Sequence, residues 1–377
     1  MDPEQRKVSL LKLIHRISES PCSVQHLNKF NVSIDSNLIK FEGRALKQEE
    51  IVHGQDKSSF YDDRVDWTYC MKDNVMYTTV PLERCIYIYP KRCERESQKL
   101  IGALKEVANG MHYKMADPRR IVLSDDRLET YVREVKKAVS MDPQMIMVIL
   151  PNNAADRYAA IKNVTCVQAA IPSQVIVAKT LTPEKGGILS IATKILIQIN
   201  CKLGGAAWMI KFPLKGVMTI GYDVTHDTRD RSKSYGAFVA SMDLRESVKY
   251  YSAVQPHVNG EQMSNNIEMN LAKALKAFMN NHDRLPERIF FYRDGVGDGD
   301  IEYVHSKEVK VLENKLMEIY NKVGGGVIPK LTFIIVNKRI NTRIFAVQGK
   351  RYANPVSGTI VDTTITLPER QVFFLFF

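Results

Sequence analysis

The chain has 377 residues, which is enough for two or more domains with sizeable cores. Its hydrophobic share of 45% is that of an ordinary globular protein, and no window reaches the roughly 18 apolar residues of a membrane helix. The formal net charge of +11 favours a polyanionic partner such as nucleic acid; the alternative is that this charge only keeps the protein dispersed.

The six cysteines show neither a Cys-x-x-Cys pair nor a matching histidine spacing. We therefore expect reduced thiols, not zinc ligands or a disulfide framework. The polar N-terminus lacks the apolar core of a signal peptide. These features predict a protein of the cytosol or nucleus without membrane attachment.

The first 82 residues begin with an amphipathic pattern that predicts a helix over Val8–Ile17, with Pro21 as a stop. Alternating apolar residues then predict two short strands, Phe30–Ile34 and Leu38–Phe41, on a polar connector.

From residue 83 the pattern alternates between strands and helices. Strands are expected at Arg84–Tyr89 and Met145–Leu150, and helices at Glu94–Ala108, Asp125–Val139 and Ile188–Leu203. This alternation predicts a parallel sheet with helices on its faces, as in a Rossmann-like α/β domain.

Two residue pairs in this region have helical spacing. Tyr158 and Lys162 are four residues apart, as are Gln198 and Lys202, so each pair shares one helical face. A ring that stacks on a base, two amines and two amides, with Gln174 as the second amide, would suit a nucleotide 5′ monophosphate. The alternative for each pair is an ordinary solvated helix face.

The third region, residues 216–377, repeats strands and helices in a different order. Strands are expected at Val217–Tyr222, Tyr235–Met242, Tyr250–Val254, Ile289–Tyr292 and Leu331–Val336, with helices at Ile267–Asn280 and Ile301–Val323. Three strands in meander order followed by alternating helices and strands predict a mixed sheet like that of ribonuclease H.

Two of these strands end on a carboxylate, Asp223 and Asp294. If both meet at one sheet edge, their oxygens would bind a hard divalent cation. The alternative is that each aspartate forms a turn, which is the role we expect for Asp298 and Asp300 in the glycine-rich loop.

Several long sequence motifs resemble those of one family. Gly221–His226, Ser234–Asp243 and Phe291–Gly299 closely resemble the PIWI domain of the Argonaute superfamily, and Phe333–Arg343 and Gly358–Arg370 resemble the Piwi clade. The resemblance runs from about residue 30 to about residue 370.

This resemblance implies three parts: a linker region over 1–82, a Rossmann-like MID domain over 83–215, and an incomplete ribonuclease H-like PIWI domain over 216–377. It implies a protein that binds a small, piRNA-like guide RNA through its 5′ phosphate and cleaves a complementary target RNA by two-metal hydrolysis. The implied cofactor is Mg²⁺, with Mn²⁺ as a substitute. Silencing-pathway proteins, transposon silencing in the germline, and a place in perinuclear cytoplasmic granules or the nucleus are also implied.

The resemblance also assigns site residues. Tyr158, Lys162, Gln174, Gln198 and Lys202 fall where Piwi proteins bind the guide phosphate, and Asp223 and Asp294 match the catalytic aspartates that hold metal. The third acid is ambiguous, because an ungapped alignment puts Gln262 at that place and a one-residue shift brings in Glu261.

The fourth catalytic group of relatives, usually a histidine, lies beyond the last matching word, and neither His226 nor His305 matches it. The sequence therefore leaves two functions open: an RNA-guided endoribonuclease, or a guide-binding silencing module that does not cleave. A DNA-processing enzyme of ribonuclease H type is disfavoured, because the Tyr158–Lys202 set would then have no role.

Overall fold

The computed structural model describes residues 2–60, 70–182, 187–227, 230, 232–244, 248–258, 260–323, 325–338, 340–349, 351–366 and 373–375, with only the backbone of Lys72, Asp73, Glu261 and Asp298. The described residues form two compact units. One contains residues up to 49, residue 60 and those from 340 onward, and the other contains 50–59 and 70–338. The division into three domains predicted from sequence stays a prediction.

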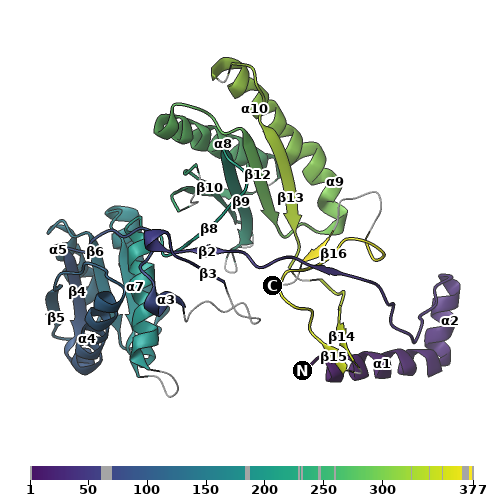
Figure 1. Ribbon diagram of the computed structural model, residues 1–377, viewed down its shortest axis with the longest axis horizontal. Helices are drawn as coiled ribbons and strands as arrows, with labels where there is room; N and C mark the ends of the chain where they lie inside the picture. Colours follow the sequence, from purple (N-terminus) through teal and green to yellow (C-terminus); the bar gives the residue numbers. More distant parts are fainter. Residues whose placement is uncertain are drawn as a thin grey trace. The chain divides into compact units, whose positions relative to one another are not determined.

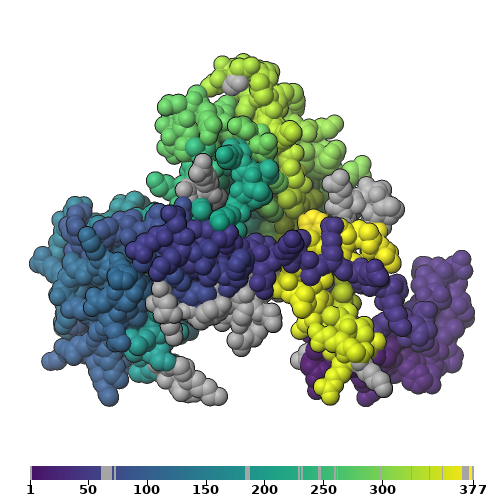
Figure 2. Space-filling model, viewed as in Figure 1, coloured from purple at the N-terminus to yellow at the C-terminus, as the bar shows by residue number. Residues whose placement is uncertain are grey.

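The smaller unit joins the two ends of the chain. Its elements are α1 (Pro3–Glu19), α2 (Pro21–Lys29), β1 (Arg44–Ala45), β14 (Ala346–Gln348), β15 (Arg351–Ala353), β16 (Thr359–Val361) and β17 (Phe374–Leu375). Strand β15 lies against α1, where the Glu4 carboxylate accepts a hydrogen bond from the Tyr352 amide at 2.8 Å. In Figures 1 and 2 the purple N-terminal helix α1 lies beside the yellow C-terminal strands of this unit.

The first helix begins earlier than predicted, at Pro3, because the Asp2 side chain caps it by accepting from the Gln5 amide at 2.8 Å. The strands predicted at Phe30–Ile34 and Leu38–Phe41 do not form. Neither segment has a ladder partner among the described strands, and a strand needs a neighbour to pair its backbone groups.

The larger unit contains a parallel sheet of four strands. Its order is β5 (Arg119–Leu123), β4 (Cys85–Pro90), β6 (Met145–Leu150), β7 (Ser173–Val177). Strands β4 and β6 are fully buried, as their apolar sequences predict. Strand β5 was not predicted, because it is a mostly exposed edge strand that begins with two arginines.

Helices cover both faces of this sheet, as predicted for a Rossmann-like fold (Figure 1). These helices are α4 (Glu94–Gly110), α5 (Leu128–Val139), α6 (Ala155–Lys162), a π-helix (Asn163–Gln168) and α7 (Ile188–Lys202). Helix α5 packs Tyr131 and Val135 on Ile86 of β4. The next residue, Tyr87, points to the opposite face and donates to the Ser97 carbonyl of α4 at 3.4 Å.

A mixed sheet of five strands follows. Its order is β11 (Tyr250–His257), β10 (Ser234–Ser241), β9 (Val217–His226), β12 (Arg288–Asp294), β13 (Lys330–Val336). The first three strands are antiparallel, and β9, β12 and β13 are parallel. This is the mixed, ribonuclease H-like sheet that the sequence predicts.

Two long helices cover one face of this sheet (Figure 1). They are α8 (Gly260–His282) and α10 (Lys310–Val323), and α10 is preceded by α9 (Ile301–Tyr303) and a π-helix (Val304–Val309). Phe238 of β10 and Phe291 of β12 meet Phe278 of α8 in the buried core. The larger unit also contains α3 (Cys70–Asp73), several short 3-10 helices and a small sheet of β3 (Ser58–Ser59), β2 (Ile51–Val52) and β8 (Met209–Ile210).

No helix in the described ranges is long and apolar enough to span a bilayer.

Phe238→Ala is expected to lower the free energy of unfolding by about 3–5 kcal/mol, because it leaves a cavity where a fully buried ring contacts Tyr251 and Phe291. Urea denaturation measures this loss. The control is Val239→Ala, since Val239 lies on the opposite face and is 38% exposed. Equal losses in the two variants would show that this face is not the core.

Candidate functional site

Asp223 and Asp294 lie next to each other on neighbouring strands. The parallel ladder between β9 and β12 ends where Arg293 faces Tyr222, and the two aspartates are the next residues on their strands. Side chains at matching positions of parallel strands point to the same face, with strands about 4.8 Å apart. The two carboxylates therefore share the face opposite the helices.

One detail differs from the sequence prediction. Asp223 is not at a strand end, because β9 continues to His226 in antiparallel pairing with β10, where Asp223 faces Ala237. Asp294 does end its strand. The turn after it depends on Gly295, which has a φ of 67° and whose amide donates to the Val336 carbonyl at 3.0 Å.

A lysine that was not predicted contacts one of the aspartates. The Lys338 ammonium donates to Asp294 Oδ2 at 2.6 Å, just beyond the end of β13. This hydrogen bond raises the pKa of Lys338, and the negative charges of Asp294 and Asp223 raise it further. Lys338 is therefore a positive charge beside both carboxylates.

On the helix side of the sheet, a buried ion pair supports the same strand end. The Arg293 guanidinium donates to the Glu308 carboxylate at 3.0 Å and to the Asp294 carbonyl at 2.7 Å. Arg293 is 7% exposed and Glu308 is 1% exposed. Burial raises the pKa of Glu308, and the Arg293 charge opposes that rise.

Glu261 and Gln262 lie in the first turn of α8, not on a loop before it. The Glu261 side chain is outside the described residues. The Gln262 side-chain carbonyl accepts from the Val258 amide at 3.0 Å. Within the described ranges, no group of three or more His, Cys, Asp and Glu side chains is close enough to hold a metal ion.

The second candidate site lies at the four-stranded sheet of the larger unit, where both predicted lysines donate hydrogen bonds to the same residue. The ammonium groups of Lys162 and Lys202 donate to the Ser173 carbonyl at 3.1 and 2.9 Å. Lys162 also donates to Ser173 Oγ at 2.8 Å. Residues from α6, α7 and β7 therefore converge at the start of β7.

The two predicted amides join this cluster. Gln174 accepts from the Lys202 ammonium at 2.6 Å and donates to the Gln198 side-chain carbonyl at 3.0 Å. These bonds fix the orientation of the Gln174 amide, because its oxygen must face Lys202. Gln198 accepts through its oxygen, so its NH₂ group is directed away from Gln174.

The cluster is strongly positive and partly removed from water. Burial lowers the pKa of Lys202, and the charge of Lys162 lowers it further. The Tyr158 ring lies 5.8 Å from the Lys162 ammonium and is 48% exposed. All five predicted binding residues thus lie in one neighbourhood, with the aromatic ring open to solvent.

Sequence reasoning missed three residues that these contacts single out: Ser173, Lys338 and Arg293. Two signals were available, because Ser173 directly precedes Gln174 and Arg293 directly precedes Asp294. Lys338 lies within the Phe333–Arg343 motif, but nothing local connects it to Asp294, which is 44 positions away in sequence.

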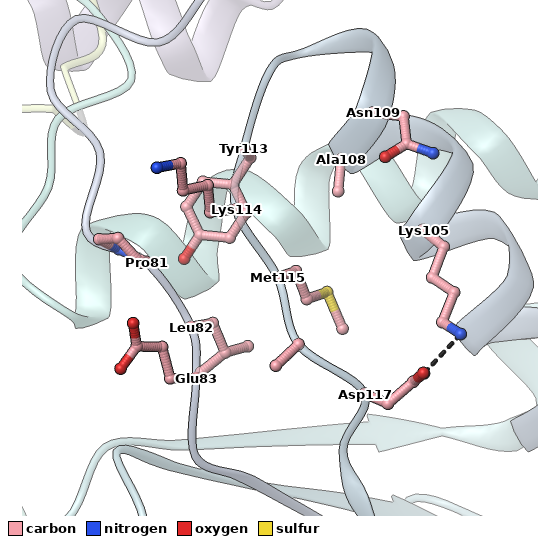
Figure 3. Close-up of a pocket in the computed structure, with 11 residues that line it drawn as sticks. Pro81, Leu82, Glu83, Lys105, Ala108, Asn109, Tyr113, Lys114, Met115 and Asp117 are labelled. Carbon is pink, nitrogen blue, oxygen red and sulfur yellow. Dashed lines mark ion pairs between the residues drawn. The ribbon is translucent and has the colours of Figure 1, made fainter.

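A separate hollow of about 600 Å³ lies where α4 ends and β4 begins (Figure 3). Figure 3 shows Lys105 and Asp117, which form an ion pair, at its side. The hollow holds two lysines and two carboxylates, adding Lys114 and Glu83, so it does not favour one sign of ligand charge. None of the predicted site residues lines it.

Comparison with known proteins identifies the family. The family model described as the Piwi domain matches residues 145–377. Protein aubergine of Drosophila melanogaster is 41% identical over all of this chain, and Piwi-like protein Siwi of Bombyx mori is 40% identical over 99% of it. The chain spans 43% and 41% of these relatives, so less than half of their length.

Solved structures agree with this assignment. The crystal structure of Drosophila Piwi matches with a TM-score of 0.89 and 38% identity, over all of this chain and 51% of that one. An Argonaute of Kluyveromyces polysporus, solved with a guide RNA, shares the fold with a TM-score of 0.70 at 18% identity, over 86% of this chain and 44% of that one. The chain therefore belongs to the Piwi family, within the Piwi clade of Argonaute proteins.

Proposed function

We propose that this chain binds the 5′ phosphate of a small guide RNA and uses the guide to recognise complementary RNA for silencing. The main support for this proposal is that the ammonium groups of Lys162 and Lys202 both donate to the Ser173 carbonyl. Their hydrogen-bond acceptors are a carbonyl, a hydroxyl and an amide, all neutral, so two positive charges lie together without a contacting carboxylate in the described contacts. An anion there would relieve their repulsion.

The groups that face the proposed phosphate are hydrogen-bond donors. Each ammonium uses two of its three N–H groups within the protein and keeps one, and Gln198 presents its NH₂ group. A site built from donors selects an oxyanion over a neutral hydroxyl. In this proposal the Tyr158 ring, which is 48% exposed, stacks on the terminal base.

Relatives support the proposal. The Argonaute of Kluyveromyces polysporus, which shares the fold, was solved with a guide RNA. For this chain we propose a piRNA-like guide, silencing of transposons in the germline, a cytoplasmic or nuclear location, and silencing-pathway proteins as partners. The division into a linker, a MID domain over 83–215 and a PIWI domain over 216–377 belongs to the same proposal.

Replacing both Lys162 and Lys202 with alanine is expected to weaken binding of a 5′-phosphorylated RNA at least tenfold more than binding of its 5′-hydroxyl form, because only the phosphate uses both charges. Fluorescence anisotropy with the two RNAs measures this. The control is Lys136→Ala with Lys137→Ala, two lysines at the end of α5. If the double variant loses affinity for both RNAs equally, the lysines are only a general basic surface.

We also propose that Asp223 and Asp294 hold Mg²⁺, or Mn²⁺ in its place, for hydrolysis of the paired target RNA. The donor set fits, because Mg²⁺ is commonly held by one or two carboxylates with water and substrate phosphate completing its shell. When bound, the metal would polarise the scissile phosphate and activate water. Glu261 is proposed as a third acid at the start of α8.

The protein's own residues have distinct parts in this second proposal. Asp223 and Asp294 orient their oxygens on one face of the sheet, and Arg293 holds the Asp294 carbonyl from the opposite face. The alternative, a guide-binding module that does not cleave, is favoured by one observation: the Lys338 ammonium is bonded to Asp294, where a metal would compete with it.

Asp223→Ala is expected to abolish Mn²⁺ binding while the protein stays folded, since removing one of two adjacent carboxylates also removes their mutual repulsion. Titration calorimetry without RNA measures the binding, and circular dichroism checks the fold. Asp300→Asn is the control, because Asp300 is exposed and is expected to serve only the turn. Unchanged Mn²⁺ affinity in Asp223→Ala would contradict a shared site.

Lys338→Met should tighten Mn²⁺ binding several-fold, because the variant removes a cation that competes for Asp294. The same calorimetry applies, and Lys338→Arg, which keeps the charge, is the matched control. Weaker Mn²⁺ binding in Lys338→Met would instead mean that Lys338 helps to build the metal site.

A further inference from the structure

Ser173 and Thr165 connect Lys162 to the protein interior through a chain of hydrogen bonds. Lys162 donates to Ser173 Oγ at 2.8 Å, and Ser173 Oγ lies 2.9 Å from Thr165 Oγ1. Thr165 Oγ1 in turn donates to the Ile161 carbonyl at 3.0 Å. Thr165 and Ile161 are 0% exposed and Ser173 is 2% exposed, so this chain of bonds is shielded from water.

The direction of every bond in this chain follows from the number of protons. A hydroxyl has one proton, and that of Thr165 goes to the Ile161 carbonyl, which can only accept. Ser173 must therefore donate to Thr165, and its oxygen accepts from Lys162, which can only donate. With this assignment the bonds from Lys162 through Ser173 and Thr165 to Ile161 all run from the ammonium inward, and Thr165 Oγ1 also lies 3.8 Å from Cys166 Sγ.

Thr165 also fixes the backbone around the cluster. It lies in the π-helix that follows α6, and its main-chain carbonyl accepts from the Ile171 amide at 2.7 Å, two residues before Ser173. A π-helix is an uncommon, widened turn that occurs often at functional sites. Thr165 thus ties the end of α6, through Ile161, to the start of β7.

We propose that Thr165 and Ser173 are positioning residues for guide 5′-phosphate recognition: their relay holds the Lys162 ammonium with one N–H directed to the phosphate. This inference rests on the proposed guide binding and names residues that act behind the five binding residues. Neither hydroxyl touches the phosphate. Each acts by limiting the positions that the flexible Lys162 side chain adopts, which lowers the ordering cost of binding.

The test uses the full chain with two RNAs that differ only in a 5′ phosphate or 5′ hydroxyl. Thr165→Val keeps the shape of the side chain but removes the hydroxyl. The ratio of the two affinities is expected to fall roughly three- to tenfold, the effect of losing one intramolecular hydrogen bond. Thr165→Ser, which restores a hydroxyl, is expected to recover most of the ratio.

Thr193→Val is the matched control. Thr193 is also buried, in α7, and its hydroxyl likewise donates four residues back, to the Leu189 carbonyl at 2.8 Å, but it has no bond to Ser173. Thr193→Val is expected to lower the free energy of unfolding to a similar degree without changing the affinity ratio. Urea denaturation of each variant provides that comparison.

The outcomes separate the two proposals. If the wild-type chain does not prefer the phosphorylated RNA, guide-phosphate binding itself fails, and the positioning role fails with it. If the wild-type chain does prefer it but Thr165→Val keeps the full ratio, only the positioning role fails. If Thr193→Val lowers the affinity ratio as much as Thr165→Val does, the positioning role also fails, because the ratio would then depend only on the stability of the fold.

Discussion

Parallel pairing of neighbouring strands is the constraint on which both candidate sites depend. In the five-stranded sheet, pairing of β12 with β9 sets Asp294 beside Asp223, although 70 residues separate them in sequence. In the four-stranded sheet, pairing of β7 with β6 sets Ser173 opposite Ile146 and fixes the acceptor that both lysines share. A one-residue slip in either register would turn these groups to the other face.

The two sites handle charge in opposite ways. At Ser173 two ammonium groups are held together by neutral acceptors, and burial of Lys202 makes that arrangement costly until an anion arrives. At Asp294 the carboxylate is paired with a cation of the protein itself, Lys338, whose side chain is 71% exposed. Under the proposed function, the first cluster would accept an anion without losing an existing ion pair, whereas a metal at Asp294 would have to displace the Lys338 ammonium.

At each candidate site, buried side chains hydrogen-bond to a site residue. Arg293 and Glu308 pair beneath the strand end that carries Asp294, and Arg293 contacts the Asp294 backbone instead of its carboxylate. At the other site the support is neutral and direct: the Ser173 hydroxyl accepts from the Lys162 ammonium and is itself hydrogen-bonded to Thr165. Breaking a buried pair leaves an unsatisfied group at large cost, so both supports resist local rearrangement. Rigid support of this kind keeps polar groups in binding geometry before the ligand arrives.

The sequence by itself determined most of the longer elements of the larger unit and indicated the family. Apolar runs such as Met145–Leu150 predicted buried strands, helical spacing predicted α4 and α7, and the order of elements predicted both sheets, because these signals are local. It also named the two aspartates and five candidate binding residues, through sequence motifs and a resemblance to Piwi proteins. The sequence did not predict edge strand β5 or the start of α8, because polar edge residues and helix caps carry weak local signals.

Only the tertiary structure decided which groups meet. Lys338 reaches Asp294 across 44 positions of sequence, and Lys202 reaches Ser173 across 29, so no local pattern links either pair. The same holds for Asp223, which proved to lie inside its strand because a hairpin partner, β10, extends the pairing beyond the parallel ladder. Such contacts depend on strand register and helix packing, which are properties of the whole folded chain and not of any one segment.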